Sequence, residues 1–108
     1  DSSVAHLYDH LHPAVLRLIA YTIKECRRAR SPVSVCGELA GELEMTELLL
    51  GMGLRQYSMH PSQILPIKER MFTLSTKDSA RLATRVLRQS DPVKIKAVLV
   101  QAANAHLS

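Results

Sequence analysis

The sequence feature that most limits the possible folds is a pair of short strand patterns separated by a helix pattern. The first covers residues 33–36 and ends at Gly37, and the second covers residues 56–59 and ends at His60-Pro61. Strands that alternate with helices indicate a parallel sheet, as in α/β proteins. Two parallel strands alone leave both outer edges unpaired. We therefore expect an α/β chain that is a piece of a larger sheet or barrel, or that associates.

Helix patterns account for most of the remaining residues. Pro13 and Pro61 suit the first position of a helix, where the missing N–H loses no intrahelical partner. Ser75, three residues before Asp78, resembles a capping box, and Asp91 is a typical N-cap because a proline follows it. We expect helices over residues 13–30, about 42–52 and 61–71, then one that begins at the Ser75 cap and one from residue 92 to near the end.

The expected helix over residues 42–52 is apolar around most of its circumference. Three consecutive leucines stand at positions 48–50, so we expect other elements to cover much of this helix. Gly51 and Gly53 are both expected to act as signals that stop it.

Composition indicates one small domain at most, with an aliphatic core, because 46% of the 108 residues are apolar but only 4% are aromatic. The formal net charge is +4, and the densest basic cluster falls near the end of an expected helix, where cations complement the helix dipole. No apolar run reaches the ~18 residues of a membrane-spanning helix. The members of the basic cluster are Lys24, Arg27, Arg28 and Arg30. We expect no nucleic-acid partner, no membrane association and no signal peptide.

Cys36 is the main candidate for a functional residue. An apolar run delivers its thiol to the carboxyl end of a strand, where α/β proteins carry their chemistry. A thiol there can act as a nucleophile, a metal ligand or a proton donor, although a free cysteine is often only a small buried hydrophobic residue. Either Glu38 or Glu42 could enter the same site, although a solvated or helix-capping role is favoured for Glu38. His60 could also face the site. A disulfide with Cys26 is possible on paper, but a reduced cytoplasmic protein is the favoured interpretation.

Histidines near the start of the chain invite a metal interpretation. His6 and His10 have the i, i+4 spacing that suits zinc on a helix. Pro13 follows at once and Asp9 is the only acidic residue nearby, so a loop with incidental histidines is favoured. We expect no metal site in this chain.

Three ordered motifs resemble enzyme I of the bacterial phosphoenolpyruvate:sugar phosphotransferase system. They are VCGELAG at residues 35–41, LLLGMGL at residues 48–54 and YSM at residues 57–59. The resemblance spans roughly residues 4–90. Pyruvate phosphate dikinases and phosphoenolpyruvate synthases share the Cys-Gly pair, but the residues that follow are more similar to enzyme I.

The resemblance implies that residues 1–108 are the C-terminal part of a (β/α)8 TIM barrel that binds phosphoenolpyruvate. Residues 33–36 would be its seventh strand and residues 56–59 its eighth. The parent enzyme would move the phosphoryl group of phosphoenolpyruvate to its own histidine and then to the histidine-containing phosphocarrier protein, releasing pyruvate. Cys36 matches the cysteine that protonates C3 of the enolate. The Mg²⁺ ligands and the substrate-binding arginines would lie upstream of Asp1, so this chain alone is expected to be inactive.

A second interpretation assigns the chain a role in assembly. Enzyme I proteins form homodimers through the barrel domain, so these helices could serve a dimer interface or contact a partner, with Cys36 as a structural residue. The resemblance is compatible with both the sugar-uptake and the nitrogen-related branches of the system.

Overall fold

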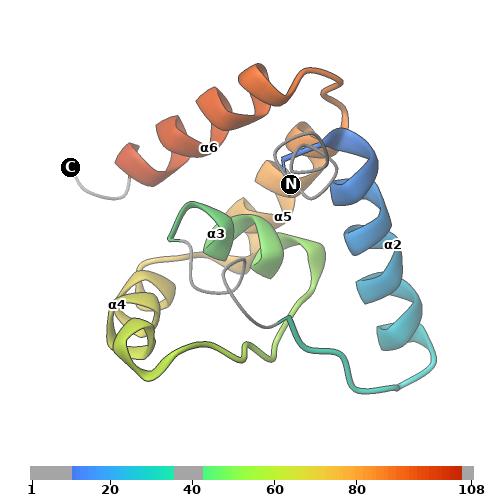
Figure 1. Ribbon diagram of the computed structural model, residues 1–108, viewed down its shortest axis with the longest axis vertical. Coiled ribbons are helices and arrows are strands. Elements are labelled where there is room, and N and C mark those ends of the chain that lie inside the picture. The colour runs from blue at the N-terminus through green and yellow to red at the C-terminus, as the bar shows by residue number, and fades with distance from the viewer. Residues whose placement is uncertain (1–10, 36–42, 106–108) are drawn as a thin grey trace, which may run out of the picture.

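The computed structural model describes residues 11–35 and 43–105, and helices form most of this part of the chain (Figure 1). Each helix that the sequence predicts is present, with ends that differ by two residues or fewer from those expected. The described helices are α2 (Pro13–Arg28), α3 (Leu43–Met52), α4 (Pro61–Phe72), α5 (Thr76–Leu87) and α6 (Pro92–Ala105).

The predicted helix starts are confirmed by side-chain hydrogen bonds. The Ser75 side chain accepts a hydrogen bond from the backbone N–H of Asp78 (3.3 Å) at the start of α5. Asp91 Oδ1 accepts one from the backbone N–H of Val93 (2.9 Å) at the start of α6. Each bond satisfies one of the N–H groups that the first turn of a helix leaves without a partner.

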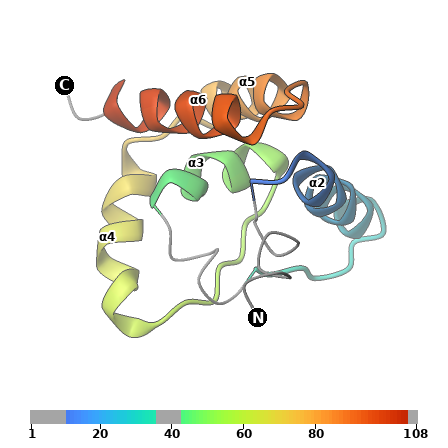
Figure 2. The same cartoon turned by 45° about the horizontal axis from the view of Figure 1, so that its top comes forward.

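Helix α3 lies at the centre of the fold, as its all-round apolar sequence predicts. Every residue from 45 to 50 is buried, and the other four helices pack around this segment, with α5 making the most extensive contact (Figure 2). The core is aliphatic, as the composition indicates. Its largest fully buried side chains are Leu16, Ile23, Met45, Leu48, Leu49, Leu54, Ile67, Ile95 and Leu99.

The two glycines near the end of α3 have different roles. Gly53 has a φ of 106° and its N–H bonds to the carbonyl of Leu50 (3.0 Å), so it ends the helix as predicted. The prediction that Gly51 is also a stop signal is wrong, because Gly51 lies inside α3. A Cβ added at Gly51 would lie 2.5 Å from the carbonyl carbon of Ser79 on α5. Gly51 is therefore the point where the backbones of α3 and α5 approach each other.

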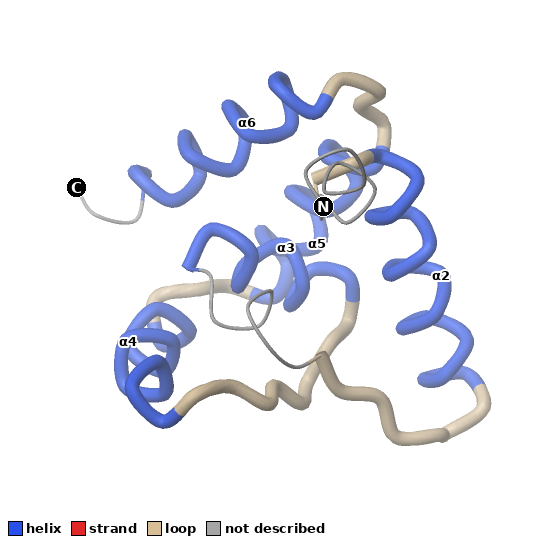
Figure 3. Tube along the Cα trace, viewed as in Figure 1, coloured by secondary structure: helices blue, strands red, loops and turns tan. Residues whose placement is uncertain are grey.

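The predicted pair of strands is reduced to one parallel bridge in the described residues. Val35 bridges Tyr57 in parallel, and the backbone N–H of Ser58 donates to the carbonyl of Val35 (2.9 Å). The parallel direction is confirmed, but the two extended strands predicted at residues 33–36 and 56–59 are wrong for the described part (Figure 3). A short pair without neighbours on either side gains too little from pairing to form a longer ladder.

Candidate functional site

The candidate site lies where the bridge brings two extended segments together. Side chains alternate in burial along both segments, as they do on a pleated strand. Val33, Val35 and Tyr57 pack against the helical core, whereas Ser34 and Ser58 are exposed. The pair therefore has one face against the helices and a second face that none of the described helices covers.

Cys36 follows this bridge directly in the sequence. Cys36, Glu38 and Glu42 themselves lie outside the described residues, as do His6 and His10, so the roles predicted for them stay predictions. One residue before Cys36 in the sequence, the Val35 carbonyl is fixed by a hydrogen bond from the backbone N–H of Ser58. Among residues 11–35 and 43–105, no group of three or more histidine, cysteine or acidic residues could hold a metal ion.

Tyr57 fastens the second extended segment to α3. Its hydroxyl donates a hydrogen bond to the carbonyl of Thr46 (3.3 Å). Burial raises the pKa of Tyr57 to about 12, although the nearby Arg55 guanidinium opposes the rise. The phenol therefore stays neutral near neutral pH and keeps its proton for this hydrogen bond. Tyr57 is not among the residues that the sequence predicts for a site, although its place between Gln56 and Ser58 fits the alternation of a half-buried strand.

Arg55 secures the end of α3 beside this segment. Its guanidinium Nη1 donates to the carbonyls of Leu50 and Leu54 (2.9 Å each). The Leu50 carbonyl lies in the last turn of α3 and also accepts from the Gly53 N–H, and the Leu54 carbonyl lies just beyond the helix. A cation at this end of α3 complements the helix dipole. The hydrogen bonds of Arg55 and Tyr57 together fix residues 55–57 against α3: Arg55 bonds at its carboxyl end, and Tyr57 bonds to Thr46 in its amino half.

The structure gives two histidines local roles at helix starts. His60 Nδ1 accepts a hydrogen bond from the backbone N–H of Ser62 (3.3 Å) and lies 2.9 Å from the Ser62 hydroxyl. His12 Nδ1 accepts in the same way from Ala14 (3.1 Å). Both side chains are exposed, so His60, a candidate site residue in the sequence, serves as the N-cap of α4.

Cys26 lies on α2, as predicted, and is a half-buried free thiol. Arg27 and Arg28 occupy the last turn of the same helix, in agreement with the helix-end interpretation of the basic cluster. No described helix is both long and apolar enough to span a membrane.

Comparison with known proteins identifies the family. Residues 1–76 match the model of the PEP-utilising enzyme family, PEP-binding domain. The chain belongs to this family. Its relatives include proteins named phosphoenolpyruvate-protein phosphotransferase. The one from Cupriavidus necator is 52% identical over 95% of this chain, and the one from Enterococcus faecalis is 37% identical over 94%.

The chain matches only a small part of the length of these relatives. The chain spans 18% of the length of the Cupriavidus necator protein and 17% of the Bacillus subtilis protein, to which it is 33% identical. The match to the family model ends at residue 76, where α5 begins. The similarity to the phosphotransferases extends further, over 95% of the chain in the Cupriavidus necator case. Helices α5 and α6 therefore belong to the part that these relatives share beyond the general PEP-binding model.

Proposed function

We propose that this chain is the C-terminal part of the phosphoenolpyruvate-binding barrel of a phosphoenolpyruvate-protein phosphotransferase, and that Cys36 is its proton donor. The parallel bridge between Val35 and Tyr57 carries the proposal, because a pair of parallel strands whose carboxyl ends meet is where a barrel enzyme builds its site. Cys36 is the next residue after the bridged Val35. The exposed face at Ser34 and Ser58 would look into the barrel of the longer protein.

The chemistry assigned to Cys36 follows from the reaction. When phosphoenolpyruvate loses its phosphoryl group, an enolate remains that must gain a proton on C3 to become pyruvate. A thiol with an ordinary pKa of ~8.5 is mostly protonated at neutral pH and can supply that proton from one face of the substrate. The phosphoryl transfer itself depends mainly on positioning and on neutralising charge, which a neutral thiol does not provide.

The groups that neutralise charge belong elsewhere in the longer protein. Among the described residues, no group of three or more histidine, cysteine or acidic side chains lies together. We place the Mg²⁺ ligands, the substrate-binding arginines and the phosphorylated histidine upstream of Asp1. The histidine-containing phosphocarrier protein is the proposed acceptor, and the enzyme is proposed to act in the cytoplasm.

Exposed apolar side chains support assembly with other parts of the parent or with a second copy. Leu65 and Phe72 lie on the exposed side of α4, with 65% and 88% of their surfaces accessible, and Val93 on α6 is 75% accessible. A groove of about 520 Å³ lies between the second extended segment and α4, beside the edge of that segment where no strand pairs in the described residues. A homodimer of the full-length protein is part of this proposal.

The test is Cys36→Ala in the full-length protein, with Cys26→Ala as the matched control. Steady-state pyruvate formation should fall by about 10²–10⁴-fold in the first variant if protonation limits the rate, while single-turnover phosphorylation of the enzyme changes less. Cys26→Ala should leave both rates unchanged, because its thiol lies on α2. If Cys36→Ala matches wild type in both rates and still delivers the proton to one face of C3, Cys36 is structural and the proposal fails.

A further inference from the structure

Helix α5 carries a row of cations along its exposed side. Lys77, Arg81 and Arg85 follow one another at four-residue spacing, so they form one ridge on the helix surface. Arg88 extends the charge beyond the last turn. All four side chains line a shallow groove of about 660 Å³, and the row of residues from 77 to 88 is ~16 Å long at the rise of an α-helix.

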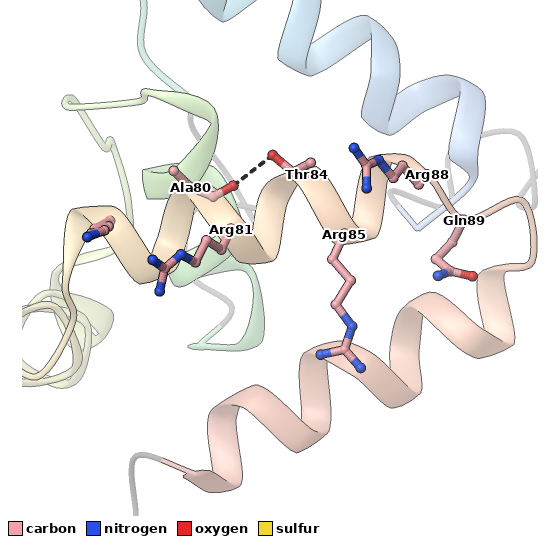
Figure 4. A pocket seen from close by; sticks show the side chains of 7 residues that line it. Ala80, Arg81, Thr84, Arg85, Arg88 and Gln89 are labelled. Carbon is pink, nitrogen blue, oxygen red and sulfur yellow. Dashed lines mark hydrogen bonds between the residues drawn. The ribbon is translucent and has the colours of Figure 1, made fainter.

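A second row of small side chains lies beside the basic ridge. Ala80 and Thr84 precede Arg88 at the same four-residue spacing, and Figure 4 shows them on the opposite edge of α5 from Arg81 and Arg85. The Thr84 hydroxyl donates to the Ala80 carbonyl within the same helix (3.1 Å), so it needs no partner from outside. The groove is therefore shallow beside Ala80 and Thr84, and its charged groups are the cations on α5 and Arg88.

The cations on this ridge are available for a partner. Arg81 has an ion pair with Asp78 (3.5 Å), but both side chains are more than half exposed, and such pairs contribute little. Asp78 is the one carboxylate on α5. Like charges four residues apart repel each other, so this ridge is a slight cost to the isolated helix that an anionic partner would remove.

We propose that this face of α5 docks an acidic helix of another protein. Helices pack by placing the i±4 ridge of one into the groove of the other, so the small row at Ala80 and Thr84 would receive the partner helix. Carboxylates at four-residue spacing on that helix would repeat every ~6 Å, the same interval as Lys77, Arg81 and Arg85. Single-stranded nucleic acid fits less well, because its binding proteins stack bases on aromatic side chains and α5 has none.

The described residues of a second copy of this chain do not supply the matching surface. No described helix carries acidic residues at i, i+4. Helix α5 also lies beyond the residues that match the general PEP-binding model. The docking role therefore belongs to the extension that this chain shares with the phosphotransferases, separate from the proposed chemistry at Cys36.

The experiment uses the full-length protein and a fluorescein-labelled helical peptide of about 15 residues with glutamate at every fourth position. Fluorescence anisotropy should report binding that weakens as salt rises. Arg81→Glu/Arg85→Glu should weaken it about tenfold or more, and Arg81→Gln/Arg85→Gln should give a smaller loss. Lys24→Glu/Lys94→Glu is the control with the same change in net charge at exposed positions of α2 and α6, and should change binding less than about threefold.

Three outcomes would overturn the proposal. One is no binding of the peptide to the wild-type protein. Another is an equal loss in the α5 and control variants, which would mean that only net charge matters. The third is tighter binding of a thymidine oligonucleotide of equal charge, which would make the partner a nucleic acid. Circular dichroism confirms that each variant folds, and phosphoenolpyruvate turnover reports separately on the proposed enzyme.

Discussion

The close approach of α3 and α5 at Gly51 leads to a prediction that opposes helix propensity. Alanine is favoured over glycine inside a helix by roughly 1 kcal/mol, so Gly51→Ala would stabilise an isolated α3. In the folded chain the new Cβ would lie 2.5 Å from the carbonyl carbon of Ser79 and 3.1 Å from the backbone nitrogen of Ala80. The Ser79 carbonyl oxygen would be closer still, and ordinary van der Waals contacts begin near 3.4 Å, so the two helices must separate by more than an ångström.

The energetic cost follows from what the methyl group meets. Its neighbours are backbone atoms, which cannot rotate away as a side chain can. Overpacking a well-filled interior costs about 1–3 kcal/mol, and a contact with backbone belongs at the upper end. Separation would also loosen the fully buried Leu48 and Leu49 from α5. After subtracting the propensity gain, we expect Gly51→Ala to destabilise the α3–α5 unit by about 2 kcal/mol.

Hydrogen–deuterium exchange in the full-length protein measures this effect locally. Peptides from α3 and α5 should exchange about 30-fold faster in Gly51→Ala, while peptides from other domains keep their rates. Ser79→Ala combined with Gly51→Ala should not restore protection, because the clash is with the Ser79 backbone. Ala97→Gly, on the exposed face of α6, measures the propensity term alone. Unchanged or slower exchange in Gly51→Ala would refute the close approach.

Three further predictions concern other parts of the chain. Arg30 has a φ of 56° just after α2, so Arg30→Gly should remove left-handed strain and stabilise the end of α2 by about 0.5–1 kcal/mol, seen as slower amide exchange there. Because burial raises the pKa of Tyr57 to about 12, its contribution to stability is complete below pH 10 and is lost as pH rises through 12. An absorbance titration should show tyrosinate forming near pH 12 in wild type but not in Tyr57→Phe, and its absence in wild type would contradict this. The 108-residue chain alone should form no pyruvate from phosphoenolpyruvate with Mg²⁺ and the phosphocarrier protein, and it should associate; turnover, or a cooperatively unfolding monomer, would count against the fragment interpretation.

Local sequence signals predict the helices well because the interactions that start them are local. Ser75 and Asp91 each bond to a backbone N–H two or three residues away, and the leading prolines need no tertiary partner. The apolar sequence of α3 likewise predicts its central position, since a helix that is apolar on most sides must be covered. These features depend on the spacing of nearby residues, so the amino-acid sequence is sufficient to predict them.

Features that depend on long-range neighbours could not be predicted in the same way. Gly51 looks like a stop signal in the sequence, and only the position of Ser79 on α5 shows that it allows two helices to cross. The cap that the His60 ring nitrogen supplies to α4 was likewise not predicted, and the site role of His60 stays a prediction. The role of Tyr57 depends on the Thr46 carbonyl, eleven residues earlier in the chain. Each outcome is decided by a contact that the one-dimensional pattern does not contain.

The single bridge at Val35 depends both on the local strand pattern and on long-range contacts. A short strand pair with both outer edges unpaired gains little stability, and the described residues supply one parallel bridge of the eight-stranded sheet that a barrel needs. Nevertheless, the one bridge that forms in the described residues lies directly before Cys36 and is held on the helix side by Tyr57. Helix α3 therefore holds the second extended segment through Tyr57 without help from a complete sheet. In the longer protein, further strands would pair in the same register. Gly51→Ala would displace α3, which holds Tyr57, so we expect it to disturb pyruvate formation as well as amide exchange.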